Sequence, residues 1–199
     1  MLFKNLECRL IKTKEELNIF NQNYLTSSSF DVGEEYLNSA HVYQIYKNGD
    51  AVAGFALNCI DWSPIRYFHF FDENLKNVIL SHNEHGIVEK RLLEITCNYK
   101  KHGEGIALEI FYYTHLFKKA YSTAKHEDKL FLLGGSIKAK IKWIQNDVMR
   151  YTLFHGPLNH PELNAKGDLE MLELYYINLP YMWYNVIKTA LKKYVLHRE

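Results

Sequence analysis

A strand, a glycine-containing turn and a helix follow one another without interruption between Leu92 and Ala124. Residues 92–99 (LLEITCNY) form a mostly apolar, partly β-branched run, which predicts a buried strand. The turn at 100–105 (KKHGEG) contains two lysines and two glycines. Beyond it, apolar residues recur every three or four positions, which predicts an amphipathic helix. These residues are Ile106, Ile110, Tyr113, Phe117, Tyr121 and Ala124.

The turn has the features of an anion site. The first amides of a helix lack an intrahelical partner and lie at the positive end of its dipole. Gly103 and Gly105 let a ligand approach the backbone, and either can adopt a positive φ. The spacing excludes a P-loop, which needs four residues between its glycines and a Gly-Lys-Ser/Thr ending. It also excludes the GxGxxG dinucleotide fingerprint, because Leu108 stands at the third glycine position.

The segment resembles the acyl-CoA-binding motif of the GNAT superfamily of N-acyltransferases. That motif has Arg or Gln, two residues, Gly, one residue, and Gly or Ala, after the fourth strand. Lys100-x-x-Gly103-x-Gly105 falls in this frame, and Tyr99 matches a tyrosine that often precedes it. Two residues depart from the pattern. Lys100 keeps the charge of Arg but loses its forked donor geometry, and Glu104 puts a carboxylate beside the expected pyrophosphate.

The resemblance implies both a fold and an acyl donor. The fold would be α+β (α/β), with a mixed, mostly antiparallel central sheet and helices on both faces. The donor would be acetyl-CoA or a longer acyl-CoA, with pantetheine along the strand and pyrophosphate in the turn. The cofactor-binding residues that it implies are Ile95, Cys97, Lys100, Lys101, His102, Gly103, Glu104, Gly105 and Ile106.

Local signals upstream of the turn fit the start of such a fold. Residues 6–11 read as a strand, and Thr13 with Glu16 forms a capping box that begins a helix. The runs 42–46 and 52–57 flank Asn48-Gly49, which predicts a hairpin with a tight turn.

Downstream of the turn, we expect a strand at 129–133 that ends at two glycines, and then a helix from Ser136 to Val148. A strand at 169–179 and a helix from Pro180 complete the pattern. In that last helix we expect an inward face, made of Tyr184, Ile187, Leu191 and Val195.

The chain of 199 residues is long enough for one domain with a substantial core. We therefore expect a single GNAT-like domain over residues 1–199, with an insertion at about 61–91 and a C-terminal strand-helix extension at about 168–199. The insertion is rich in aromatic residues and leaves two interpretations open. It is either a small extra strand and helix packed on the core, or an aromatic wall beside the acceptor or a long acyl chain.

Two residues are candidates for acid–base catalysis. Acyl transfer to an amine requires that the amine lose a proton and that charge on the thioester oxygen be stabilised. Glu94 is the candidate base, because the family often places a carboxylate on this strand; the alternative is a carboxylate paired with a surface Arg or Lys. Tyr151 is the candidate acid, in place of a tyrosine that the family carries after its fifth strand.

Composition excludes several classes of protein. A net charge of +1 argues against a general nucleic-acid binder. No apolar run reaches the length of a membrane span, and the first residues lack the apolar core of a signal peptide. Cys8, Cys59 and Cys97 have neither disulfide nor zinc spacing, and we expect them to be small buried residues. Histidine pairs such as His82 and His85 lack further ligands at metal spacing, so no metal site is expected.

We therefore expect a cytoplasmic acyl-CoA-dependent N-acyltransferase that acts on a small-molecule amine in a ternary complex. The oligomeric state is open, with a homodimer as one alternative. A second reading is a non-catalytic GNAT-like domain that binds an acyl-CoA or a protein partner. A third is an interaction module that uses the aromatic insertion as its contact surface.

Overall fold

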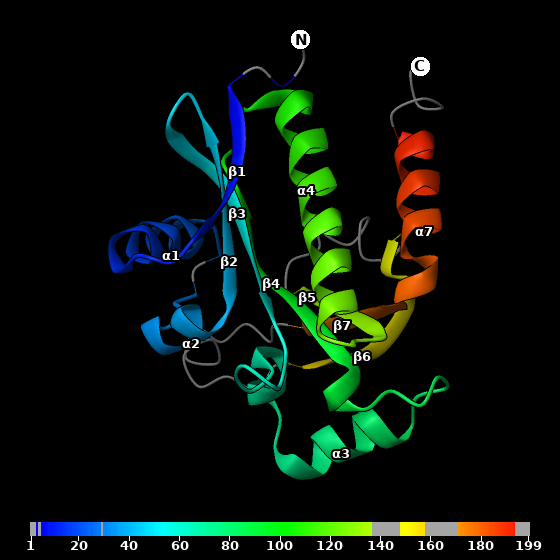
Figure 1. The fold of residues 1–199 in the computed structure, drawn as a ribbon. Coiled ribbons are helices and arrows are strands. Elements are labelled where there is room, and N and C mark those ends of the chain that lie inside the picture. The colour runs from blue at the N-terminus through cyan, green and yellow to red at the C-terminus, as the bar shows by residue number, and fades with distance from the viewer. Residues whose placement is uncertain (1–2, 4, 29, 137–147, 158–170, 194–199) are drawn as a thin grey trace. The chain divides into compact units, whose positions relative to one another are not determined.

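The structure is a computed structural model that describes residues 3, 5–28, 30–136, 148–157 and 171–193. Its strands form a seven-stranded mixed sheet in the order β1-β2-β3-β4-β5-β7-β6 (Figure 1). The chain divides into two compact units, one of Met1–Ser63 with Ile95–Thr123 and one of Pro64–Glu94 with Ala124–Glu199. Strand β4 (Leu92–Lys100) contributes to both, because the boundary falls between Glu94 and Ile95.

The first unit begins with an antiparallel meander. Strands β1 (Leu6–Ile11), β2 (His41–Lys47) and β3 (Asp50–Asn58) pair in sequence order. The hairpin prediction is confirmed. Asn48 and Gly49 connect β2 to β3 with φ values of 54° and 92°, the positive values that a two-residue turn requires.

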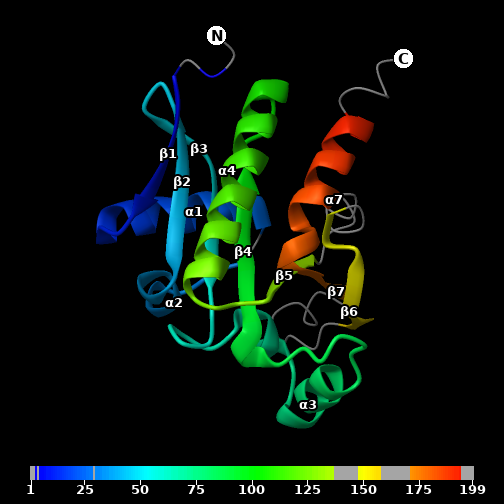
Figure 2. The same ribbon diagram turned by 45° about the vertical axis from the view of Figure 1, so that its right-hand side comes forward.

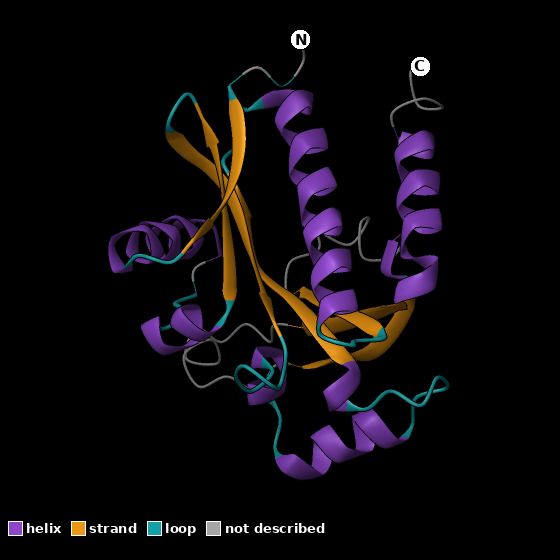
Figure 3. Ribbon diagram, viewed as in Figure 1, coloured by secondary structure: helices purple, strands orange, loops and turns teal. Residues whose placement is uncertain are grey.

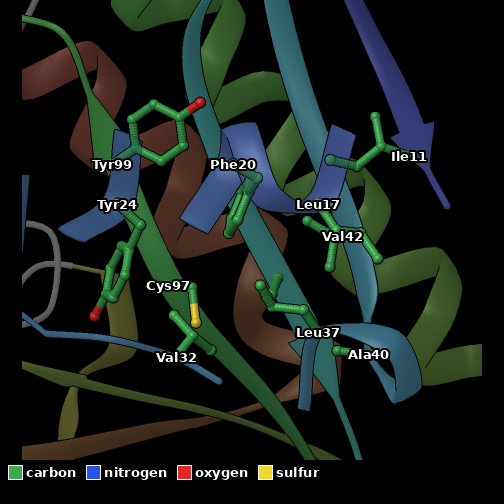
Figure 4. Close-up of a cluster of buried hydrophobic side chains, with 11 residues drawn as sticks. Ile11, Leu17, Phe20, Tyr24, Val32, Leu37, Ala40, Val42, Cys97 and Tyr99 are labelled. Carbon is green, nitrogen blue, oxygen red and sulfur yellow. The ribbon is translucent and has the colours of Figure 1, made fainter. Parts of the chain in front are cut away.

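Helices cover both faces of this unit. Helices α1 (Lys14–Ser28) and α2 (Glu34–Ser39) lie on one face and α4 (Gly105–His126) on the other (Figures 1 and 2). The capping box is present at the start of α1, where the Glu16 amide donates to Thr13 Oγ1 over 3.3 Å. The core under α1 combines helix and strand side chains (Figure 4): Ile11, Leu17, Phe20, Tyr24, Val32, Leu37, Ala40, Val42, Ala56, Cys97 and Tyr99.

Helix α4 is present as expected, but part of its predicted inward face is wrong. Phe117 and Ala124 are buried, whereas Ile106 is 58% exposed. The buried side chains of α4 include Leu108, Phe111, Tyr112, Leu116 and Ala120. The inward face is therefore rotated from the predicted stripe, and Ile106 stands exposed beside the glycine turn.

The second unit contains the remaining strands: β5 (Phe131–Ser136), β6 (Tyr151–Pro157) and β7 (Met171–Asn178). Strand β7 pairs antiparallel with both β5 and β6. Strand β6 was missed from the sequence, since His155-Gly156-Pro157 reads as a turn. Gly134 and Gly135 lie within β5 rather than after it. The helix predicted from Ser136 to Val148 lies mostly outside the described residues.

Helix α7 (Leu179–Leu191) follows β7, with proline in its first turn as predicted. Its predicted inward face is wrong, because Tyr184, Ile187 and Leu191 are all more than half exposed. The buried positions are Leu179, Met182, Asn185 and Thr189. Val195 lies outside the described residues.

The segment 61–91 contains helical turns and loops (Figure 3): η1 (Arg66–Phe70), α3 (Glu73–Ser81) and η2 (Glu89–Arg91). All of its residues are described and none is in a strand, so the extra strand predicted here is wrong. The segment packs its apolar side chains against the second unit's sheet. That core contains Ile65, Tyr67, Phe68, Ile87, Leu92, Phe131, Leu133, Leu172, Leu174 and Tyr176.

Candidate functional site

Strand β4 contains one residue of left-handed backbone conformation, Cys97. This residue has a φ of 52°, a left-handed conformation that costs a non-glycine residue on the order of 1–3 kcal/mol. The side chains of Ile95 and Cys97 are 4% and 2% exposed. Any contact that these two residues make with a bound molecule must therefore come from their backbone groups.

The glycine turn connects β4 to α4. Gly103 and Gly105 have φ values of 84° and 77°, so both take the positive φ that the sequence allowed. A Cβ at either position would meet no heavy atom within 4 Å, which leaves the space over the backbone open. The Lys101 amide donates to the Val52 carbonyl oxygen over 2.9 Å and anchors the turn to β3. The turn therefore presents exposed backbone at the start of a 22-residue helix.

Two ion pairs involve charged residues of the turn. The Lys47 ammonium lies 2.6 Å from Glu104 Oε2, so the carboxylate that the sequence placed beside the anion site is neutralised by a lysine from the β2–β3 hairpin. The Lys100 ammonium lies 3.3 Å from Glu109 Oε2 in α4. Lys101 and His102 are exposed. Sequence reasoning missed Lys47, since nothing local connects it to a residue 57 positions later.

Buried polar contacts hold β4 on both faces. Tyr112 of α4 donates to Asn98 Oδ1 over 2.9 Å, and its hydroxyl lies 3.4 Å from the Gly54 carbonyl oxygen. On the other face, the Tyr99 hydroxyl accepts a hydrogen bond from Gln44 Nε2 over 2.9 Å. Burial raises the pKa of Tyr99. Tyr99, which matches the family's motif tyrosine, is thus a core residue that positions the strand.

Glu94 is fully buried, and its two carboxylate oxygens accept hydrogen bonds from backbone amides. Oε2 accepts from Arg66 over 3.1 Å and Oε1 from Tyr67 over 2.8 Å, at the first residues of η1. Glu94 therefore lies in the core rather than at the surface, and it holds the 61–91 segment through the backbone amides of η1. The Tyr67 hydroxyl in turn donates to the Gly135 carbonyl oxygen over 3.2 Å.

Tyr151 begins β6 and stands opposite Tyr176 of β7. Their rings stack with centroids 5.2 Å apart, and the His85 ring lies 4.5 Å from that of Tyr151. His85 Nδ1 is 2.6 Å from the Tyr176 hydroxyl oxygen. Burial, the charge of Glu84 and the nearby Tyr151 raise the pKa of Tyr176. Tyr151 and Glu94 both belong to the second unit, whereas the predicted cofactor residues belong to the first.

Within the described ranges, no three His, Cys, Asp or Glu side chains gather closely enough to hold a metal ion. None of the helices in the described part of the chain has an apolar stretch of the length that a bilayer span requires.

Comparison with known proteins finds no matching family model. No curated protein matches the sequence either. Solved structures do match. FeeM, an N-acyl amino acid synthase from uncultured soil microbes, has a TM-score of 0.64 at 14% identity, over 96% of this chain and 97% of its own. The C-terminal condensation domain of Ebony, in complex with β-alanyl-dopamine, has a TM-score of 0.60 at 11% identity, over 87% of this chain and 98% of its own.

A third similar structure was solved with its cofactor. It is yncA from Salmonella typhimurium, a putative acetyltransferase with acetyl-CoA, which has a TM-score of 0.53 at 13% identity over 88% of this chain and 94% of its own. At sequence identities this low, the structural likeness establishes a shared fold and nothing more. The seven-stranded mixed sheet with its helices agrees with that assignment. The chain therefore has the fold of the GNAT-family N-acyltransferases.

Proposed function

We propose that this protein is an acyl-CoA-dependent N-acyltransferase that moves an acyl group from a CoA thioester to a small amine. The observation that carries the proposal is the open glycine turn between β4 and α4. Two glycines of positive φ expose the backbone there, at the positive end of a long helix. In addition, the yncA structure, which has the same fold, contains acetyl-CoA.

The residues of the turn fit a diphosphate. The Lys101 amide is bonded to Val52, so the proposed donors are the exposed amides from His102 to Ile106, and the open space over Gly103 and Gly105 leaves room for an anion. Lys47 offsets the charge of Glu104, which would otherwise repel a phosphate. Lys100 and His102 border the same site. Pantetheine would run along the backbone of Ile95 and Cys97, where the left-handed residue interrupts the extended strand.

Glu94 and Tyr151 are the proposed general base and general acid. Each of the Glu94 carboxylate oxygens also accepts a backbone hydrogen bond, which gives the residue a positioning role as well. Tyr151 has a polar neighbourhood of His85 and Tyr176 that suits proton transfer. In the proposed reaction, the acyl carbon exchanges its bond to sulfur for a bond to the amine nitrogen.

A second candidate function is a GNAT-like domain that binds an acyl-CoA or a protein partner without turnover. The engagement of both Glu94 oxygens is the observation that favours it, because it leaves the expected base without an unoccupied oxygen. The enzyme and a domain that binds acyl-CoA require the same CoA site, so only turnover separates those two; a domain that binds a protein partner requires no such site.

The test measures binding and turnover together. Acetyl-CoA should raise the melting temperature, because a ligand of the folded state stabilises it. Free CoA thiol should then appear when acetyl-CoA or decanoyl-CoA is mixed with a panel of free L-amino acids and dopamine. Binding without thiol release from any pair would favour the second candidate. No melting shift with either acyl-CoA would contradict the enzyme and the acyl-CoA-binding domain, and would leave the domain that binds a protein partner.

A matched pair of variants locates the site. Gly103→Asp places a carboxylate in the turn and should abolish the melting shift. Gly33→Asp is the control, since Gly33 has the same φ of 84° and also has open space where a Cβ would stand. It should leave the shift unchanged. An equal loss in both variants would trace the effect to backbone strain rather than to a phosphate site.

A further inference from the structure

Strand β1 lies at one edge of the sheet, and among the described residues only β2 pairs with it (Figure 2). An edge strand leaves a row of backbone N–H and C=O groups unpaired, which makes it a template for a strand of another chain. Several side chains of β1 reach solvent. Leu10 is 41% exposed, and the side chains of Glu7 and Arg9 are 55% and 53% exposed. The outer side of β1 is therefore available for pairing.

The two faces of β1 differ in chemistry. Side chains alternate along a strand, so Glu7 and Arg9 project on the same face as Ile11. Ile11 packs in the core under α1, which places the two charges on the α1 side of the sheet. The alternate residues form an apolar stripe on the opposite face, the side of α4: Leu6, Cys8 and Leu10. The strand thus has a charged face and an apolar face.

The sequence of β1 is complementary to itself. In an antiparallel pair of two copies centred on Cys8, Glu7 stands opposite the partner's Arg9, and Leu6 stands opposite the partner's Leu10. Directly opposed residues of antiparallel strands project from the same face of a sheet. Two pairs of opposite charges therefore form on the α1 side, and two leucine pairs form on the α4 side. Both kinds of cross-strand pair stabilise a sheet.

Other registers lack this match. A shift by two residues puts Glu7 opposite the partner's Glu7, or Arg9 opposite the partner's Arg9, and like charges that oppose each other directly destabilise a pair of strands. A shift by one residue puts the apolar stripe of one copy on the charged face of the other. Charges on an edge strand commonly prevent pairing with other chains. Here they favour one register and oppose its neighbours.

We propose that two copies of this chain associate through β1, in an antiparallel pair centred on Cys8 that joins their sheets edge to edge. The association does not depend on the proposed enzymatic function. In the single chain, Arg9 Nη2 lies 2.5 Å from Glu7 Oε2, and in the dimer each of these charges also faces its opposite on the partner. The pairing covers only Leu6–Leu10, less than the interface of a permanent dimer, so we expect a Kd of roughly 10–100 µM.

Exchange of charges tests this register. Glu7→Arg opposes like charges in both pairs, and Arg9→Glu does the same with the other sign. Each variant alone should raise the Kd measured by sedimentation velocity at least about tenfold. A mixture of the two variants should form a heterodimer with the wild-type Kd, because each supplies the charges that the other needs. The double variant should dimerise as the wild type does.

The matched control is Glu34→Arg. The Glu34 side chain is 53% exposed, close to that of Glu7, and it pairs with Lys14 over 2.9 Å. The substitution changes the net charge by the same amount as Glu7→Arg, but it lies outside β1. It should leave the Kd of the dimer unchanged, so a weaker dimer in this variant would trace the effect to net charge and overturn the proposed register.

Cross-linking checks the centre of the pair. Opposed Cβ atoms lie about 4.5–5.5 Å apart, so a short bis-maleimide should link two copies through Cys8, whereas Cys59 and Cys97 are buried. Cys8→Ser should abolish the link. A wild type that stays monomeric at about 1 mM would overturn the proposal. A dimer that both charge variants retain, or one that does not link at Cys8, would overturn it as well.

Discussion

Gly135 is a glycine because two side chains occupy the space where a Cβ would stand. A Cβ there would lie 2.5 Å from the Tyr67 ring and 2.8 Å from Leu174 Cδ2. The Tyr67 side chain cannot move away, because two hydrogen bonds hold the residue in place. Its hydroxyl donates to the Gly135 carbonyl oxygen, and its backbone amide donates to the Glu94 carboxylate. The close approach brings the 61–91 segment onto β5.

Gly135→Ala should therefore destabilise the protein by about 1–3 kcal/mol through overpacking. Gly134→Ala is the neighbouring control, since its Cβ would meet only the flexible end of Met149, at 3.1 Å. It should change stability by less than about 1 kcal/mol. Urea denaturation of both variants checks this, and equal losses would show that the contact with Tyr67 is not tight.

The Lys47–Glu104 pair should set the affinity for CoA. Lys47→Gln leaves the Glu104 carboxylate uncompensated beside the phosphate site, and we expect the Kd for CoA to rise about fivefold, equivalent to about 1 kcal/mol. Glu104→Gln should lower the Kd, and the double variant should return near the wild type. Calorimetric titration in low salt measures all three, and a Kd unaffected by Lys47→Gln would remove Glu104 from the site.

At the scale of elements, Glu94 acts as the anchor of η1. Glu94→Gln keeps one acceptor oxygen but presents an amide N–H to a backbone N–H, so one of two charge-assisted bonds is lost. The expected cost is about 1–3 kcal/mol. In this variant, hydrogen exchange at the Arg66 and Tyr67 amides should be faster than in the wild type, whereas exchange at the strand amides should change less.

The same variant tests the catalytic role of Glu94. Unchanged exchange at Arg66 and Tyr67 together with a loss of turnover would contradict the anchoring role and support Glu94 as the base. Faster exchange with turnover retained would support the anchoring role and leave proton transfer to another residue.

Elements with local signals could be predicted from the sequence. The capping box at Thr13, the Asn48-Gly49 hairpin and the glycine turn each depend on a few adjacent residues, and each is present in the structure. Strand β6 could not be predicted, because it is partly exposed and ends in Gly156-Pro157. It becomes a strand only by pairing with β7.

The face of a helix could not be predicted where a distant partner decides it. Large apolar residues on α7 predicted an inward stripe, yet Asn185 and Thr189 are buried in their place. Asn185 donates to the Val148 carbonyl oxygen over 3.1 Å, so a polar side chain is satisfied by a residue 37 positions earlier. The contact between His155 Nδ1 and Glu173 Oε1, at 2.9 Å, escaped prediction for the same reason, since only the pairing of β6 with β7 brings the two residues together.

At the scale of the molecule, several acids that are wholly or partly buried hold their protons in the folded state. Burial raises the pKa of Cys8 from 9.0 to about 11, and burial also raises the pKa of Tyr43 and of Tyr99. The unfolded chain loses the Cys8 proton at a lower pH than the folded chain does. The stability that Cys8 contributes is thus fully present below pH 9 and is lost as the pH rises through about 11.

The free energy of unfolding should therefore fall between pH 9 and 11, with the tyrosines acting in the same direction at higher pH. Cys8→Ala should flatten this part of the pH profile. Denaturant titrations at pH 8, 9, 10 and 11 measure the effect. A free energy of unfolding that rises over this pH range, or one that falls equally steeply in Cys8→Ala, would contradict the role given to Cys8.

The central claim is that the backbone amides from His102 to Ile106, in the turn that begins at Lys101, bind the diphosphate of CoA. Hydrogen exchange of this segment, followed by mass spectrometry with and without ligand, tests it most directly. CoA and dephospho-CoA should both slow exchange at these amides, whereas pantetheine, which lacks the diphosphate, should not. Exchange that CoA leaves unchanged in this segment, or that pantetheine slows equally, would contradict the account.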